Sequence, residues 1–175
     1  IQQASTIASA KQNQAIETGH VLLGIVEMAE SLVDFLLQKL ESNPSLIRQL
    51  TDQIVENYPK VSGGEPYLSK DATRALQKAL SAAKSMDDQY ASVEHLFLGL
   101  LGSGDPISSM LKDSGVNEKG LRAAITELRK GEKVKSQTAE DTYNALDRFA
   151  TNLNEMARTG KLDPIIGRDD EIRRL

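Results

Sequence analysis

Two histidines are the first residues to consider for chemistry, because an imidazole titrates near neutral pH and is a common metal ligand. They are His20 and His95, and the sequence has no cysteine that could complete a metal site with them. A zinc site needs three or four protein ligands that converge. We therefore interpret both histidines as packing or helix-capping groups, and we expect neither a metal nor catalysis.

A phosphate-binding loop is the second candidate, since Gly160 is followed by Lys161. The loop of an ATPase requires a further glycine upstream of this pair and a serine or threonine directly after it. Glu155 and Leu162 occupy those two positions. The chain also lacks the Gly-x-Ser-x-Gly elbow of serine hydrolases. We expect no ATP hydrolysis, no other catalysis and no bound cofactor in this chain.

Composition narrows the classes of partner. The net charge is −4, and binding to nucleic acid needs a clustered basic surface, so we expect no nucleic-acid partner. No apolar run is long enough to span a bilayer, and the longest, residues 21–26, has the length of a buried helix segment. With no cysteine, the chain suits a reducing compartment. We expect a cytoplasmic protein with no membrane partner.

An internal repeat determines where these residues lie. Residues 19–26 align with residues 94–101 without a gap, so that His20 pairs with His95 at an offset of 75 (positions 20 and 95). The same offset pairs Ala4 with Ala79, Ala8 with Ala83, Leu36 with Leu111, Leu46 with Leu121 and Thr51 with Thr126. Most matched residues are apolar or small, which indicates that the repeat preserves a packing pattern.

Each copy of the repeat carries start and stop signals for four helices. The expected N-caps are Thr18 and Asn43 in the first copy, and Ser69, Ser92, Asp105 and Asn117 in the second. Prolines follow Asn43 and Asp105, as is common at the first helical position. No segment shows a convincing alternating strand pattern. The sequence therefore predicts an all-α fold of two four-helix units about a pseudo-twofold axis.

Composition also predicts the boundaries. Residues 1–57 form the first repeat, 58–68 a non-helical connector, 69–130 the second repeat and 131–138 a linker. Residues 139–175 open with a helix whose apolar stripe has no partner in the repeats, which marks an interface. A further helix begins near Asp169 and is cut off at Leu175. We expect this segment to be the start of a larger domain.

Residues 160–174 resemble the start of the first ATPase domain of the Clp-type AAA+ unfoldases. The paired His-Leu-Leu-Leu-Gly-type helices, at residues 20–24 and 95–99, resemble the duplicated Clp N-terminal repeat. The linker residues Gly131, Glu132 and Val134, with residues 139–141, resemble the B-type disaggregases more than the protease-coupled types. The resemblance spans the whole chain.

This resemblance implies a homohexameric machine that uses ATP and Mg²⁺ to thread aggregated polypeptides through a pore, together with a DnaK-type chaperone system. The N-terminal domain would bind unfolded or aggregated polypeptide and deliver it to the protein's own AAA+ domains. Ile165, Ile166 and Gly167 match positions that contact adenine in the full-length protein. Asp88 and Glu94 match acidic positions linked to aggregate handling. The alternative is an adaptor-docking domain of a protease-coupled, A- or C-type unfoldase.

The binding surface itself follows from what unfolded clients share, which is exposed apolar segments. A shallow apolar groove rimmed by charge would bind them and release them again. We expect the helix that carries Leu76, Ala79 and Leu80 to form its wall. In the competing interpretation these three residues belong to the core, which we prefer for at least one of them, and Asp88 belongs to a solvated helix end.

Overall fold

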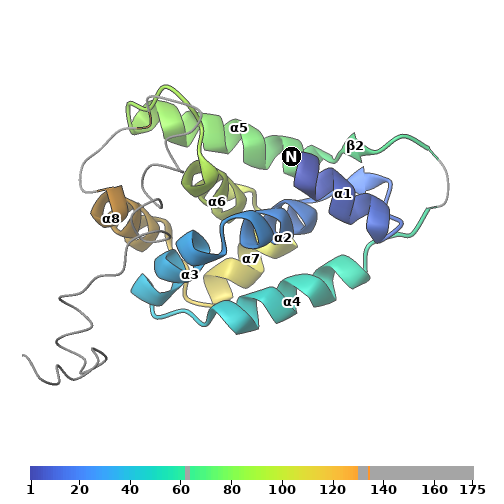
Figure 1. The fold of residues 1–175 in the computed structure, drawn as a ribbon, viewed down its shortest axis with the longest axis horizontal. Coiled ribbons are helices and arrows are strands. Elements are labelled where there is room, and N and C mark those ends of the chain that lie inside the picture. Colours follow the sequence, from blue (N-terminus) through green and yellow to red (C-terminus); the bar gives the residue numbers. More distant parts are fainter. Residues whose placement is uncertain (62–63, 130–133, 135–175) are drawn as a thin grey trace, which may run out of the picture. The chain divides into compact units, whose positions relative to one another are not determined.

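The computed structural model describes residues 1–61, 64–129 and 134, and within them the chain forms eight helices and two short strands (Figure 1). The elements in chain order are α1 (Gln2–Ala10), β1 (Ala15–Ile16), α2 (Thr18–Met28), α3 (Glu30–Lys39), α4 (Pro44–Glu56), β2 (Tyr67–Leu68), α5 (Lys70–Ser85), α6 (Val93–Gly102), α7 (Pro106–Asp113) and α8 (Glu118–Arg129). The all-α prediction is confirmed, with four helices in each copy. Apart from Val134, the predicted linker and residues 139–175 lie outside the described residues.

Side-chain caps begin most helices where the sequence predicts them. The side-chain oxygens of Asn43, Ser69, Asp105 and Asn117 each accept a hydrogen bond from a backbone N–H of the first turn, at 3.2, 3.1, 2.8 and 2.8 Å. Each bond satisfies one of the N–H groups that a helix start leaves without an internal partner. These local signals therefore place α4, α5, α7 and α8.

The predicted cap at Thr18 is wrong by one residue. Glu17 is the N-cap of α2, and its side chain and that of His20 form a reciprocal capping box. Thr18 is already helical, and its hydroxyl donates instead to the buried carboxylate of Asp105 in the second copy. Threonine is the better intrinsic cap, but the repeat aligns Glu17 with Ser92, the cap of α6. The repeat alignment therefore predicts the N-cap of α2 better than the intrinsic capping preference of threonine does.

The repeat offset changes partway through each copy. An offset of 75 holds through the second helices, and it relates the left-handed residues Gln12 (φ 60°) and Asp87 (φ 59°). In the fourth helices the buried positions match at 74 instead, since Ile47 and Leu121 are both fully buried. The gapless pairings of Leu46 with Leu121 and of Thr51 with Thr126 are therefore wrong. Leu46 is 45% exposed. From the start of the second helix to the start of the fourth, the second copy is one residue shorter than the first (Val93 to Glu118 against Thr18 to Pro44).

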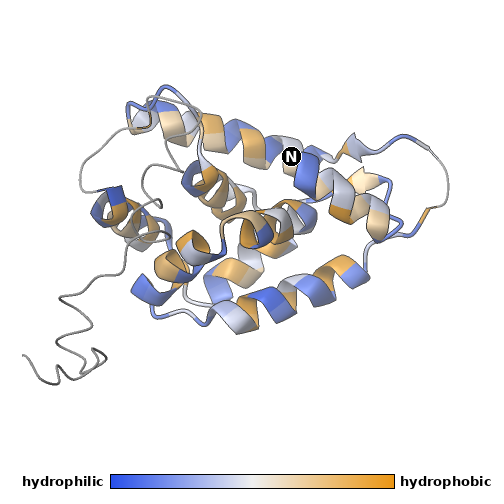
Figure 2. Ribbon diagram, viewed as in Figure 1, coloured by the Kyte–Doolittle hydropathy of each residue, from blue (hydrophilic) through white to orange (hydrophobic). Residues whose placement is uncertain are grey.

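The two copies share one hydrophobic core. In Figure 1, α2, α6 and α7 lie between α5 and α4, and across the copies α2 packs on α5 and α6, α4 on α7, and α3 on α8. Figure 2 shows α2 and α6 as mostly apolar, and residues 21–26 are all buried, as predicted. Neither copy encloses its own core, so the repeats stabilise each other. No helix of the described part is long and apolar enough to cross a membrane.

The short strands were not predicted. β1 in the first copy pairs with β2, at the end of the connector, as a parallel two-residue ladder with Ala15 opposite Tyr67 and Ile16 opposite Leu68. Two residues are too few to show an alternating pattern. The connector thus returns to the first copy and hydrogen-bonds to it before α5 begins.

Glycine allows a close helix contact where α6 crosses α5. A Cβ atom added at Gly99 would overlap the carbonyl oxygen of Ala75 and lie 2.9 Å from the nitrogen of Ala79. Both are backbone atoms, so only a shift of a whole helix could relieve the clash. At Gly24, the equivalent position in α2, an added Cβ would lie 3.3 Å from the nitrogen of Ala4, which is tight but tolerable.

Gly99→Ala should therefore lower the free energy of unfolding by about 1–3 kcal/mol, the usual cost of overpacking. The matched variant Gly24→Ala should change it by less than about 1 kcal/mol, because the higher helix propensity of alanine offsets mild crowding. Urea unfolding followed by circular dichroism measures both. Equal effects at the two positions would contradict the described α5–α6 contact.

Candidate functional site

A buried charged cluster lies at the N-terminus of α6, where the α5–α6 loop meets the end of α8. The guanidinium of Arg129 lies 2.6 Å from Asp88 Oδ2 and 3.2 Å from Glu94 Oε1. The side chains of both acids are fully buried, and that of Arg129 is 3% exposed. Arg129 also donates to the hydroxyl of Ser92 at 3.1 Å. One guanidinium thus joins the two acidic residues that the sequence singled out.

His95 belongs to the same cluster as a neutral cap. The backbone N–H of Ser92 donates to its Nδ1 at 2.9 Å, so that this nitrogen carries no proton, and its Nε2 lies 2.9 Å from Asp88 Oδ2. Burial, and next the charge of Arg129, lower the pKa of His95 despite the neighbouring carboxylates. The interpretation of the histidines as capping groups is confirmed, since His20 closes the equivalent capping box at α2.

The cluster also fastens the start of the linker. Asp88 Oδ1 accepts a hydrogen bond from the N–H of Val134 at 2.7 Å, and the N–H of Gln89 donates to the carbonyl of Val134 at 3.0 Å. Val134 is itself buried, at 2% exposure. Burial opposes ionisation of Asp88, but the hydrogen bonds from Val134 and Arg129 outweigh it and hold the pKa of Asp88 below its ordinary value. Asp88 therefore remains a carboxylate that holds the linker.

In the first copy, the loop before the second helix has the same arrangement around its histidine, but with uncharged side chains. Asn13, the counterpart of Asp88, lies 3.1 Å from His20 Nε2 and donates to the carbonyls of Tyr58 and Pro59 at 3.4 and 3.0 Å. Gly19 stands where the second copy has Glu94, and the side chains of Val55 and Tyr58 fill the space beside it. In both copies the loop residue thus holds the chain that leaves the fourth helix.

The three residues expected in an apolar wall lie apart from this cluster, on α5. Ala79 is 1% exposed and belongs to the core, as we preferred for at least one of them, while Leu76 is half-buried and Leu80 is 56% exposed. The structure thus presents one leucine of α5 to solvent. Ile165, Ile166 and Gly167 lie outside the described residues.

Sequence reasoning missed Arg129 and Val134. Arg129 follows Leu121 and Ile125 at four-residue spacing, so a signal existed, since a charged residue on the apolar face of a helix needs a buried partner. Nothing in the sequence indicated the position of Val134, because the hydrogen bond that holds it comes from Asp88, which is distant in the sequence.

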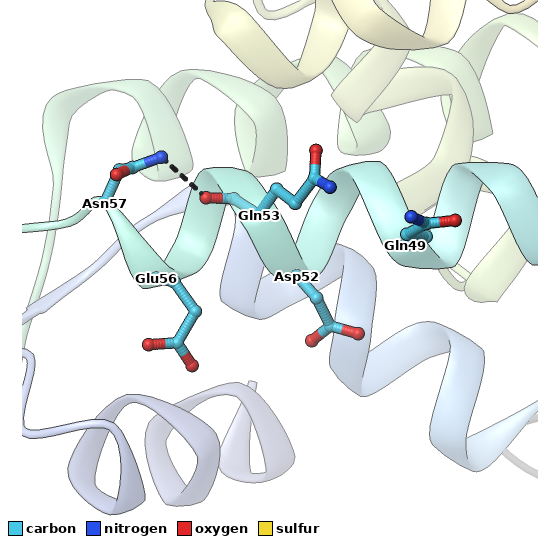
Figure 3. A pocket seen from close by; sticks show the side chains of 5 residues that line it. All are labelled: Gln49, Asp52, Gln53, Glu56 and Asn57. Carbon is cyan, nitrogen blue, oxygen red and sulfur yellow. Dashed lines mark hydrogen bonds between the residues drawn. The ribbon is translucent and has the colours of Figure 1, made fainter.

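An open hollow of about 710 Å³ runs along α4 and is a candidate for a second site (Figure 3). It is lined by Gln49, Asp52, Gln53, Glu56 and Asn57. Glu56 pairs with Lys11, which directly follows α1, and this hydrogen bond lowers the pKa of Glu56. A general acid needs a raised pKa. Glu56 therefore gives no sign of acting as a general acid.

Comparisons with known proteins point to one group. Residues 1–114 match the family described as the Clp repeat (R) N-terminal domain. The whole chain is 49% identical, over 175 residues, to a protein named chaperone protein ClpB of Bacteroides thetaiotaomicron and to one of the same name of Porphyromonas gingivalis. It covers 20% of each, so it spans about a fifth of the length of these relatives.

Solved structures agree on the fold. The crystal structure of the Hsp104 N-terminal domain from Candida albicans matches with a TM-score of 0.67 and 20% identity, over 77% of this chain and 89% of that chain. A structure titled as part of a malarial protein secretion system matches with a TM-score of 0.61 and 17% identity, over 74% of this chain and 89% of that one. At these identities the likeness concerns the fold alone.

The charge cluster leads to a stability prediction. Arg129→Met leaves two buried carboxylates without a counter-charge, and we expect it to lower the free energy of unfolding by about 3–5 kcal/mol in urea titrations. Adding Asp88→Asn and Glu94→Gln removes those charges, so the triple variant should regain most of the loss. A cost below about 1 kcal/mol for the single variant would show that water reaches the cluster.

The histidines lead to a pH prediction. Burial, followed by the charge of Lys11, lowers the pKa of His20 from 6.5 to about 4. Between these values the unfolded chain binds a proton that the folded chain does not, so stability should fall as the pH drops from 6.5 towards 4. The loss from His20 amounts to about 3 kcal/mol at most. His95 acts in the same direction.

Thermal unfolding at a series of pH values measures this effect. A His20→Gln variant has no group to titrate there, so its stability should decline less steeply over the same window. An equal decline in both proteins would mean that His20 is protonated in the folded state.

Proposed function

Because the chain belongs to the Clp repeat N-terminal domain family, we propose that it is the client-binding module of a ClpB-type disaggregase and receives unfolded or aggregated polypeptide. The named relatives are chaperones, and the chain corresponds to about a fifth of their length. In this proposal the hexameric motor that consumes ATP and Mg²⁺ lies in the rest of a longer cytoplasmic protein. A DnaK-type chaperone system would be a partner, and Ile165, Ile166 and Gly167 would contact adenine.

The observation that carries the proposal is an exposed leucine on α5. Leu80 is 56% exposed, one turn after the half-buried Leu76, on a helix whose Ala79 packs into the core. The exposed side chains of Arg74 and Lys78 lie on the same helix. An exposed apolar side chain can bind the apolar segments that unfolded chains share, weakly enough for release. The buried face keeps the helix rigid while its outer face binds.

Asp88 and Glu94 act indirectly in this proposal. Their side chains are fully buried, so they cannot contact a client in this conformation. Through Arg129 and Val134 they hold the linker against the α5–α6 loop. We assign them as positioning residues that set where the chain leaves the client-binding domain.

Leu80→Glu should weaken binding of a permanently unfolded client by about tenfold, because burying the rest of a leucine side chain contributes about 1.5 kcal/mol. The measurement is fluorescence anisotropy with a dye-labelled test protein that is held unfolded by reduction and alkylation. The native form of the same test protein should bind neither the unmodified chain nor the Leu80→Glu variant.

Leu46→Glu is the matched control, since Leu46 is also an exposed leucine, at 45%, on α4 of the other copy. It should bind the client as the unmodified chain does. Equal weakening by both variants, or none by Leu80→Glu in a folded protein, would refute the placement on α5. Failure of the unmodified chain to distinguish unfolded from native protein would refute the function.

A further inference from the structure

The two copies differ in charge where the first helix of each copy passes the end of the second. In the first copy, the side chain of Gln3 on α1 donates to the carboxylate of Glu27 on α2 at 2.7 Å. At the offset of 75, the second copy has Lys78 and Gly102 at these two positions (3 and 27 against 78 and 102). Since Gly102 has no side chain, Lys78 donates to its backbone carbonyl instead. The second copy thus has a lysine here and lacks the acidic neighbour.

The arginines of the fourth helices differ in the same direction. Arg48 on α4 pairs with two carboxylates of α3, one of which is Asp34 at 2.8 Å. Its counterpart at the offset of 74 is Arg122 on α8, which pairs at 2.9 Å with Glu118 of its own helix. On α7, Ser109 occupies the position that corresponds to Asp34. The second copy therefore has the arginine with a neutral residue where the first copy has an acidic partner.

These cations line two adjoining hollows among α5, α6, α7 and α8. The hollows measure about 270 and 450 Å³, and both are lined by Lys78, Gly102 and Glu118. Arg122 lines the first of them, and Lys112 of α7 lines the second. Three cations against one acid give the lining a net charge of +2, although the whole chain has a net charge of −4.

The floor of both hollows is apolar. The side chains of Ala82 and Leu98 line the first hollow and those of Leu101 and Val116 line the second, and all four residues are buried. The second copy thus presents cations around an apolar floor, on a protein that is acidic as a whole. Charge complementarity at such a surface favours a partner of the opposite sign.

We propose that the two hollows bind an acidic segment of a partner protein. Its carboxylates pair with Lys112, Lys78 and Arg122, and an apolar side chain of the segment lies on the floor. Cations spread over two hollows suit a row of carboxylates, as in other sites that recognise acidic motifs. The pair of Arg122 with Glu118 is exposed and contributes little, so Arg122 can bind a further carboxylate.

This acidic-segment site is separate from the proposed client site. Lys78 and Leu80 are two positions apart on α5, so their side chains project about 200° apart around the helix axis. Leu80 lines neither hollow. Binding of an acidic segment therefore does not depend on client binding at Leu80, and the second copy can hold a partner and a client on different sides of one helix.

The first test gives the second copy the carboxylate of the first copy, by Gly102→Glu in the full chain. A Cβ atom at Gly102 would meet the flexible side chain of Lys78, with Cδ at 3.0 Å, so the variant should fold. The probe is a dye-labelled peptide in which leucine alternates with aspartate and glutamate, and fluorescence anisotropy measures its binding. Gly102→Glu should weaken binding by about tenfold, because the new carboxylate competes for Lys78. Unchanged binding to the folded variant would overturn the proposal.

A charge-matched pair of variants provides the second test. Lys112→Glu reverses a cation of the second hollow, and Lys119→Glu reverses an exposed lysine of α8 that lines neither hollow. Both variants change the net charge equally, so Lys112→Glu should weaken binding of the acidic peptide by about tenfold and Lys119→Glu by much less. Equal losses would show that binding follows net charge, which would refute a site at the hollows.

Two further measurements distinguish the occupants of the hollows. A peptide with serine in place of leucine should bind more weakly, and equal binding would mean that the apolar floor has no role, against the proposal. In the free chain labelled with nitrogen-15, Gly102→Glu should leave the amide signals of residues 139–142 unchanged. A shift there would show that the chain's own acidic residues, Glu140 and Asp141, lie in the hollows, and partner binding would be overturned.

The unfolded client separates this site from the proposed function. Lys112→Glu should bind the reduced and alkylated test protein as the unmodified chain does. If the acidic peptide binds and the unfolded protein does not, the function fails and the acidic-segment site stands. If the unfolded protein binds and the acidic peptide does not, the site is refuted and the function stands.

Discussion

A neutral, buried histidine at the start of the second helix of each copy is the constraint on which the surrounding structure depends. Its Nδ1 accepts the backbone N–H of the cap residue, and its Nε2 faces a side chain of the preceding loop. The imidazole thus joins helix, cap and loop into one unit. Because burial keeps the ring neutral, this unit can lie against the apolar α2 and α6 without an unpaired charge.

The loop residue beyond each histidine distinguishes the two copies. Asn13 offers amide hydrogens, and it binds carbonyls of the connector. Asp88 offers only acceptors, so it binds the N–H of Val134 and requires Arg129 as a counter-charge. The two copies therefore share one geometry at this position, but the loop side chain is a hydrogen-bond donor in the first copy and an acceptor in the second. The first copy uses it to lead the chain into α5, and the second to hold the start of the linker.

In the proposed function, the same divergence separates the surfaces that support the fold from those that a client would contact. Pairing with β2 covers the edge of the first copy, so this copy acts as support. In the second copy, Leu80 and Tyr90 are exposed. A client site on this copy needs no catalytic group. It needs only a rigid framework, which the tight crossing of α5 and α6 provides.

The sequence by itself determined the features that depend on local signals and on the repeat: eight helices, most of their caps, and the core residues of α2 and α6. It failed wherever distant residues decide the outcome. Thr18 is a good cap in isolation, but its hydroxyl bonds to Asp105 in the other copy. Leu46 matches Leu121 in a gapless alignment, but one missing residue turns it outward. Asp88 and Glu94 were identified from their resemblance to known positions, yet only the tertiary structure buried them around Arg129, since a buried charge is tolerated only where the fold brings its partner.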